Sequence, residues 1–215
     1  MGRAHRQAAR RRVMLRHERA LWTQGVAHIA GVDEVGVGPL AGPLVAAAVI
    51  LPKDCPLRGV DDSKKLSAAR RQALRDEIAG CAVAIGVGVV AVDDVDRLNT
   101  YWAAIEAMRR ALAALPVAPE QVLVDARTIP GLDLPQTALI KGDARSYSIA
   151  AASIVAKVIR DEMMAELDCR YPAYGFARHM GYGTAEHLAA LSRFGPCPEH
   201  RRTFQPVVQS RLPGL

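Results

Sequence analysis

The chain has 215 residues, half of them hydrophobic, and a formal net charge of +6. This length suits one domain with room for a small appendage, and the aromatic content of 5% requires a core built from Val, Ile, Leu and Ala. The longest apolar run, 44–51, is far shorter than the roughly 20 residues of a membrane-spanning helix, and no secretory signal follows the first arginines.

The charge is unevenly distributed along the sequence. Residues 1–20 carry +6, residues 170–215 carry +4, and the segment between them carries −4. An acidic centre between basic ends is typical of a protein that binds cations at its centre and a polyanion at its periphery. A disordered basic tail and an ordinarily solvated surface explain the same distribution equally well.

After a flexible extension over 1–20, helical in part at most, the sequence predicts a mixture of strands and helices. In chain order these are strands at 26–32 and 43–51, a helix over 67–80, a strand at 82–92, a helix over 94–115, strands at 121–124 and 137–140, and helices over 148–168 and 185–194. Ser67 is expected to cap its helix, and Gly86 and Gly88 indicate a bulge or a close backbone approach. The order predicts an α/β fold with a mixed sheet flanked by helices and a small helical C-terminal appendage.

Acidic residues follow three of the predicted strands. Asp33 and Glu34 come after the first, Asp125 after another, and Asp143 after the segment at 137–140. Groups at strand ends converge at a sheet edge, and hard carboxylate oxygens suit Mg²⁺ or Mn²⁺, two of which can clamp a phosphodiester. Each acid alone is more often a cap or an ion-pair partner. Because neighbours in a strand point to opposite faces, Asp33 and Glu34 are expected to share a site only if the strand breaks between them.

A glycine-rich loop, Gly36-Val37-Gly38-Pro39, follows the first two acids. It matches the weak dinucleotide-binding pattern G-x-G-x-x-A, which needs a helix directly after it, whereas Pro43 and the valines beyond it predict a strand. We therefore favour close approach of the backbone to a sugar or phosphate. An oxidoreductase that uses this loop, and a nucleic-acid-binding module without catalysis, are the alternatives.

Other polar segments are candidates for substrate contacts. Ser63 and Lys64 offer a hydroxyl and a cation to phosphates, although such a loop is also an ordinary lead-in to a helix. Tyr182, between two glycines, can stack on a sugar or base, or simply occupy a turn. Lys157 and Asp161 are spaced i, i+4 and are expected to pair, which makes Asp161 a weak metal candidate.

Several motifs occur together in a distinctive order. They are Gly31-Val32-Asp33-Glu34-Val35-Gly36, Asp62-Ser63-Lys64-Lys65-Leu66, Leu123-Val124-Asp125, Lys141-Gly142-Asp143, the run 150–157, Arg160-Asp161, Tyr171-Pro172, Gly181-Tyr182-Gly183-Thr184 and the run 200–204. From about residue 29 to residue 207 the chain thereby resembles ribonuclease HII, the bacterial type 2 ribonuclease H.

The resemblance implies an RNase H-like catalytic domain over 21–170, with a C-terminal helical and loop region over 171–215 packing on it. It implies hydrolysis of the RNA strand of RNA·DNA hybrids, including single ribonucleotides embedded in duplex DNA. Two-metal-ion hydrolysis would leave a 5′-phosphate and a 3′-hydroxyl.

The resemblance also implies roles for individual residues. The metal-binding acids would be Asp33, Glu34, Asp125 and Asp143. Gly36 and Gly38 would sense the ribose 2′-OH through their backbone, and Tyr182 would lie at the ribose–deoxyribose junction. Val37 stands where the family usually has an arginine, and the absence of that phosphate interaction is expected to cost roughly 1.5–3 kcal/mol. Our hypothesis is that the Arg-rich extension over 1–20 compensates.

The expected environment is the cytoplasm, and the expected state is a monomer without membrane contact. The four cysteines have no metal-binding spacing and are expected to be free thiols, as in a reducing compartment.

Overall fold

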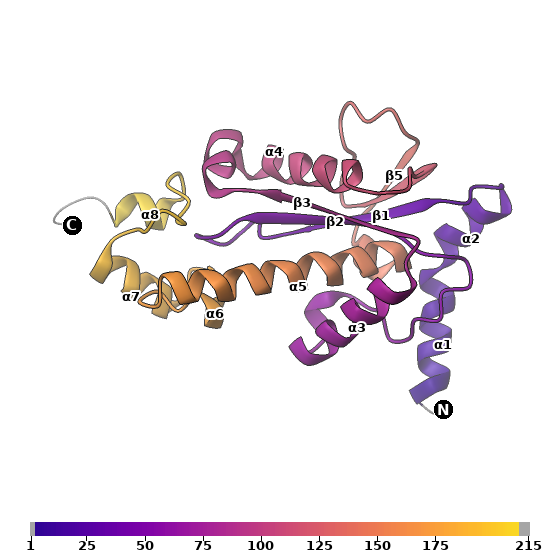
Figure 1. Ribbon diagram of the computed structural model, residues 1–215, viewed down its shortest axis with the longest axis horizontal. Helices are drawn as coiled ribbons and strands as arrows, with labels where there is room; N and C mark the ends of the chain where they lie inside the picture. Colours follow the sequence, from indigo (N-terminus) through magenta and orange to yellow (C-terminus); the bar gives the residue numbers. More distant parts are fainter. Residues whose placement is uncertain (1–2, 211–215) are drawn as a thin grey trace.

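The computed structural model describes residues 3–210, and a five-stranded mixed sheet lies at its centre (Figure 1). The strands are β1 (Ile29–Val35), β2 (Leu44–Ile50), β3 (Ala84–Val90), β4 (Gln121–Asp125) and β5 (Gln136–Leu139), in the spatial order β3-β2-β1-β4-β5. The pairs β1–β2 and β2–β3 are antiparallel, whereas β1–β4 and β4–β5 are parallel. The predicted mixed sheet is confirmed.

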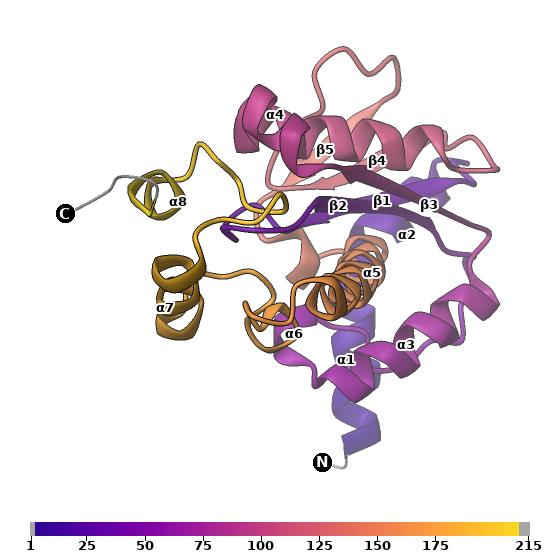
Figure 2. The ribbon, with the colours of Figure 1, turned by 60° about the vertical axis from the view of Figure 1, so that its left-hand side comes forward.

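Helices cover both faces of this sheet (Figure 2). They are α1 (Arg3–Met14), α2 (Arg16–Thr23), α3 (Ala68–Cys81), α4 (Val92–Ala113), α5 (Tyr147–Arg170), α6 (Phe176–His179), α7 (Ala185–Phe194) and α8 (Gln205–Gln209). Helix α4 lies on one face, and α5 and α3 lie on the other. Ser67 caps α3 as expected, because its side chain accepts from the Arg70 amide. Helix α4 has an unexpected kink at Asn99, whose φ is 63° and whose side chain caps the following turn.

Glycines allow the helices to approach the sheet closely. A Cβ atom at Gly88 would lie 2.0 Å from the Ala107 carbonyl oxygen of α4, and one at Gly86 would lie 2.1 Å from that of Ala111. Of the two interpretations of these glycines, the close backbone approach is therefore confirmed. On the other face, a Cβ at Gly31 of β1 would lie 2.1 Å from the Ser148 carbonyl carbon of α5.

The N-terminal segment differs from the flexible extension that the sequence predicted over residues 1–20. From Arg3 onward it forms helices α1 and α2, and Met14 and Leu15 are buried in the core under α5. Glu18 is fully buried, and its Oε1 accepts from the Ser148 amide at 2.9 Å and from Ser146 Oγ at 2.6 Å. This carboxylate thus caps α5, a role that the arginine-rich composition of the segment does not reveal.

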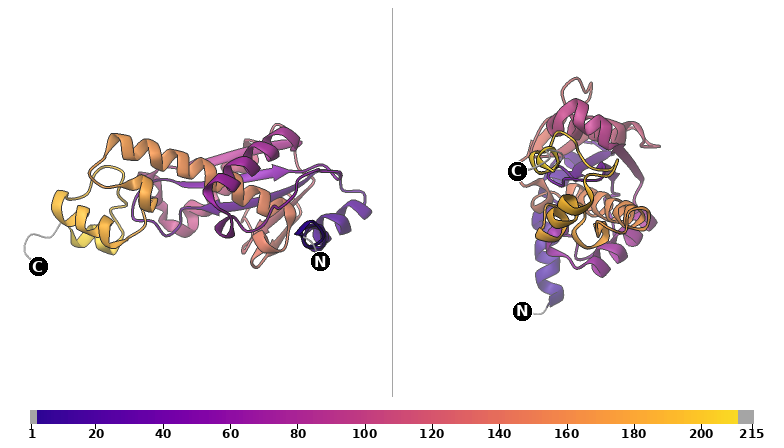
Figure 3. Two further views of the ribbon diagram at one scale, coloured as in Figure 1. Left: turned by 90° about the horizontal axis from the view of Figure 1, so that it is seen from below. Right: turned by 90° about the vertical axis from the view of Figure 1, so that its left-hand side faces the viewer.

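The C-terminal helices lie at the opposite end of the molecule from α1 (Figure 3). Tyr174 and Phe176 pack with Met164 and Leu167 near the end of α5. The division into a catalytic domain and a C-terminal region that packs on it stays a prediction. The four cysteines are free. Within residues 3–210, no helix combines the length and hydrophobicity that crossing a membrane requires.

Replacing Gly31 with Ala should lower the free energy of unfolding by about 3 kcal/mol, because the added methyl group would meet the backbone of α5. The matched control is Gly80→Ala on α3, where a Cβ meets nothing within 4 Å. That change should stabilise by about 0.5–1 kcal/mol. Urea denaturation measures both, and equal stabilities of the two variants would contradict the close β1–α5 contact.

Replacing Glu18 with Ala should destabilise the protein by about 1–3 kcal/mol, because the Ser148 amide would be left without its buried acceptor. Glu166→Ala on the exposed side of α5 serves as the control and should change stability by less than about 0.5 kcal/mol. Thermal unfolding followed by circular dichroism compares them. An unchanged melting temperature for Glu18→Ala would refute the capping role.

Candidate active site

Asp33 and Asp125 are neighbours because the strands that carry them pair in parallel. The ladder between β1 and β4 ends at the pair Val32 and Val124, so the next residue of each strand is an aspartate. Adjacent strands lie about 4.8 Å apart. The register therefore brings together two acids that are distant in the sequence.

Asp33 and Glu34 both belong to β1, which continues without a break to Val35. The strand break that the expectation of a shared site required is absent, and the sharing of one site by the two acids stays a prediction. Strand β4 ends at Asp125, while β1 extends beyond the last residue that pairs with β4. Both acids lie close enough to Asp125 for its charge to raise their pKa values.

Asp143 reaches the same region through the turn that follows β5. The amide of Gly142 donates to Asp125 Oδ1 at 2.6 Å and fixes this turn, Gly142–Ala144, beside the end of β4. Asp143 is only 9% exposed. Burial, followed by the charges of Asp62 and Asp125, raises its pKa. The structure therefore brings the four predicted acids into one neighbourhood.

Burial and mutual repulsion disfavour the charged forms of these carboxylates. Asp33 is 5% exposed, and burial, then Glu34, then Asp125, raise its pKa well above the ordinary value, against the effect of Ser153. Burial also raises the pKa of Glu34, although the nearby Arg127 guanidinium, at 3.4 Å, opposes the rise. A cation placed among these groups would relieve both effects.

The donor set fits a hard divalent cation. The four acids supply oxygen ligands, and Glu34 Oε2 is buried without a hydrogen-bond partner. In the described part of the chain, no three His, Cys, Asp or Glu side chains are already arranged around one ion position. Three of the carboxylates have contacts of their own: Asp33 accepts from the Glu34 amide, Glu34 pairs with Arg127, and Asp125 accepts from the Gly142 amide.

The segment Asp62-Ser63-Lys64 lies against this neighbourhood. Ser63 Oγ is 2.9 Å from Ser153 Oγ in a buried contact that ties the segment to α5. The Lys64 charge acts on both Glu34 and Asp143 and opposes the rise in their pKa values. Ser63 and Lys64 were predicted as substrate contacts, whereas no sequence pattern indicated that Asp62, Ser153 or Arg127 would lie beside the acids.

The segment 36–43, which we call the glycine loop, lies beside Tyr182. A Cβ at Gly38 would be 3.8 Å from Tyr182 Cε1, and Gly36 has a φ of +95°, a conformation that favours glycine. The Val37 side chain packs on the core beneath α4. A strand follows Gly42, so the dinucleotide-binding alternative is wrong.

Two buried histidines support the backbone near Tyr182. His187 Nδ1 is 2.9 Å from the Tyr182 carbonyl oxygen, and its Nε2 is 2.9 Å from His200 Nε2. The Cys197 amide donates to His200 Nδ1 at 3.0 Å. Burial, with a smaller effect of His187, lowers the pKa of His200 to about 4. This histidine is therefore neutral near pH 7 and supplies no positive charge.

Asp161 lies outside the acid group. It pairs with Lys157 at 2.5 Å, as expected from their spacing, and with Arg71 at 3.6 Å. These cations already neutralise it, in line with the expectation that it is a weak metal candidate.

Comparison with known proteins finds one and the same family over most of the chain. The family model described as Ribonuclease HII matches residues 30–207. A ribonuclease HII of Geobacillus thermodenitrificans is 61% identical over 202 residues, which cover 93% of this chain and 78% of the relative.

Solved structures show the same fold. Ribonuclease H2 from Pyrococcus horikoshii OT3 has a TM-score of 0.72 and 27% identity, over 85% of this chain and 96% of that chain. A Bst ribonuclease HIII in complex with Mn²⁺, at 21% identity and a TM-score of 0.65 over 86% of this chain and 69% of that chain, shares the fold. The expected RNase H-like fold is confirmed, and the chain belongs to the ribonuclease HII family, whose members cleave RNA in RNA–DNA hybrids.

Proposed function

We propose that this ribonuclease HII binds divalent metal ions, Mg²⁺ or Mn²⁺, through the acids that meet beyond the paired ends of β1 and β4. The proposed ligands are Asp33, Glu34, Asp125 and Asp143. The observation that best supports this assignment is the parallel register that ends at Val32 and Val124. It makes the proximity of two acids a property of the backbone and not of a side-chain rotamer.

The substrates that we propose are RNA·DNA hybrids and DNA duplexes with single embedded ribonucleotides. When bound, a pair of such ions supplies an activated water and stabilises the departing 3′ oxygen, which yields 5′-phosphate and 3′-hydroxyl ends. The chain itself orients the acids: Ser153 lies beside Asp33, Arg127 holds Glu34, and the Gly142 amide holds Asp125.

The proposed substrate contacts flank the acids. The residues are Gly36, Val37, Gly38, Ser63, Lys64 and Tyr182. Close packing of Tyr182 beside Gly38 supports a platform on which one nucleotide rests while the loop amides face its sugar and phosphate. Since Val37 packs on the core, the loop offers no side-chain cation to a phosphate.

A basic surface on α1 and α2 is the proposed contact for the flanking duplex. A cavity of about 690 Å³ is lined by these helices and the 53–58 loop, and its lining holds one acid, Asp54, against five cations. The cations are Arg11, Arg12, Arg19, Lys53 and Arg58. Deleting residues 1–20 is not a clean test of this surface, because the deletion also removes the buried Glu18.

We propose that the protein acts as a monomer. Its four free thiols suit the reducing cytoplasm that we propose as its location.

The acids are tested by Asp33→Asn and Asp125→Asn on duplexes with one ribonucleotide or a long RNA stretch. Each change should reduce cleavage in Mg²⁺ or Mn²⁺ by at least about 100-fold, the scale of removing one group that stabilises a transition state. EDTA should abolish cleavage by the unchanged protein. Melting temperatures should not fall for Asp33→Asn, since a repelled, buried carboxylate is removed.

The control for this experiment is Asp93→Asn on the exposed surface of α4, which should cleave normally. Cleavage by Asp33→Asn or Asp125→Asn at a rate near that of the control would overturn the metal assignment.

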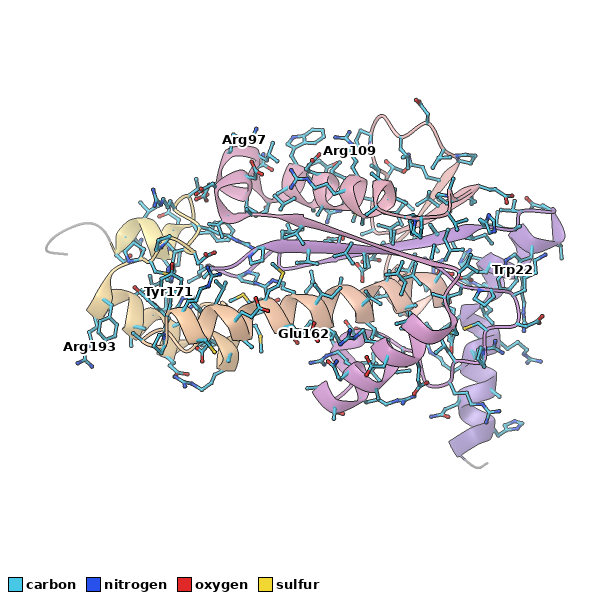
Figure 4. All side chains as sticks on the ribbon, viewed as in Figure 1. Trp22, Arg97, Arg109, Glu162, Tyr171 and Arg193 are labelled. Atoms are coloured by element: carbon cyan, nitrogen blue, oxygen red, sulfur yellow. The ribbon has the colours of Figure 1, made fainter. Side chains whose placement is uncertain are left out.

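The basic surface is tested by the double change Arg12→Ala and Arg19→Ala. Both side chains are exposed, so folding should be unaffected. The slope of log affinity for a hybrid against log salt should flatten by roughly 0.9 for each phosphate that the variant no longer neutralises. Arg109→Ala on α4, on the other face of the sheet (Figure 4), is the control. Equal slopes in both variants would exclude this surface from duplex binding.

A further inference from the structure

Arg160 and Arg201 are the largest side chains that are fully buried, each at 0% exposure. Their guanidinium groups donate to main-chain carbonyls. Arg160 donates to Pro43, Met180 and Ala41 at 3.0, 3.1 and 3.2 Å. Arg201 donates to Gly36 at 2.5 Å, to Val37 at 3.0 Å, and to Gly42 at 2.9 and 3.2 Å. Together they hold the glycine loop, residues 36–43.

These two charges have no carboxylate partner at ion-pair distance within residues 3–210. Asp161 acts on Arg160 and Asp96 acts on Arg201 only at longer range. Asp161 is paired with Lys157, and Asp96 accepts from Thr203. Burial, with a contribution from Arg160, lowers the pKa of Arg201 to about 9, so it is still protonated at neutral pH. Buried charges without counterions are unfavourable by several kcal/mol each. Their presence at both positions therefore indicates a function.

The carbonyl contacts determine where the amides of the loop point. The peptide bonds are trans, so the N–H of each peptide unit points away from its C=O. Because the carbonyls of Gly36 and Val37 face Arg201, the amides of Val37 and Gly38 face away from it. Among the loop and turn contacts of the described residues, neither amide donates to a carbonyl. Two successive free amides form a small anion-binding concavity.

This concavity lies beside the proposed ribose platform. A Cβ at Gly38 would be 3.8 Å from the Tyr182 ring, and Arg160 also contacts the Met180 carbonyl, two residues before that tyrosine. The loop begins directly after β1, which carries Asp33 and Glu34. An anion at the loop would therefore lie next to the acids, where a phosphate of the substrate strand is needed.

We propose that Arg160 and Arg201 are positioning residues for substrate binding. They turn the Val37 and Gly38 amides toward a backbone phosphate of the nucleic acid, and their two uncompensated charges, placed behind the loop, attract that phosphate. The inference rests on the proposed function, and it explains how a loop with an apolar side chain at position 37 binds a polyanion.

The test compares Arg201→Met, which removes the charge and the forked donors, with Arg201→Lys, which keeps only the charge. Arg109→Met is the exposed control. KM and kcat are measured on the single-ribonucleotide duplex at a temperature where all variants are folded. Hybrid affinity is measured separately in an Asp125→Asn parent, so that binding is read without cleavage.

Arg201→Met should raise KM and weaken hybrid binding by about tenfold or more, with kcat within about threefold, because the acids stay in place. A tenfold change corresponds to 1.4 kcal/mol. Arg201→Lys should fall between Arg201→Met and the unchanged protein, since it restores charge without the fork. Arg109→Met should match the unchanged protein.

Other outcomes overturn the inference. A purely structural role would reduce kcat or the folded fraction and leave KM and affinity unchanged, or leave Arg201→Lys as weak as Arg201→Met. If Arg201→Met does not fold, Arg201→Lys decides alone, and a KM equal to that of the control refutes the positioning role. A parent that binds no hybrid refutes the proposed function itself, whereas binding that is equal in parent and Arg201→Met refutes only this inference.

Discussion

The direct contact between β1 and α5 is the constraint on which the rest of the structure depends. Gly31 has no side chain, so the backbone of α5 at Ser148 can lie against the centre of the sheet. Ser153 follows Ser148 along α5 by a little more than one helical turn. The same contact therefore brings Ser153 beside Asp33. At its N-terminal end, α5 follows directly on the turn that carries Asp143. One close packing therefore fixes acids from two distant parts of the chain.

The acids lie in surroundings that are electrostatically unfavourable to them. Carboxylates are gathered with little solvent, and the neighbouring cations, Arg127 and Lys64, offset only part of their repulsion. The glycine loop presents the opposite case, with two buried guanidinium groups and, among the residues that the structure describes, no carboxylate at ion-pair distance. Unbalanced charges of opposite sign thus lie on adjacent segments. A metal-bound polyanion carries complementary charges for both.

Much of the fold follows from local patterns in the sequence. Valine-rich runs marked the strands, Ser67 marked the start of α3, and the glycines of β3 marked its contact with α4. The acids could be proposed from their places after strands, but only the parallel register shows that Asp33 and Asp125 are neighbours.

What could not be predicted depends on contacts between distant residues. The arginines of α1 and α2 suggested a solvated tail, because the sequence does not show that Glu18 meets Ser148, 130 positions later. Arg201 looked like one more basic residue of the C-terminal region, although its guanidinium binds carbonyls 159–165 positions earlier. The uninterrupted course of β1 through Asp33 and Glu34 depends on its pairing with β2, where Asp33 lies opposite Ala47 and Glu34 opposite Ala46.

The cap that Glu18 provides also has a consequence for the order of events during synthesis. A ribosome releases the N-terminal helices first, at about 5–20 residues per second, yet their acceptor site at residues 146–148 emerges far later. Until then Met14 and Leu15 lack the side chains of α5 that complete the core around them. The nascent chain therefore waits for several seconds with an exposed, positively charged amphipathic segment, and closure of this long loop is a late step of folding.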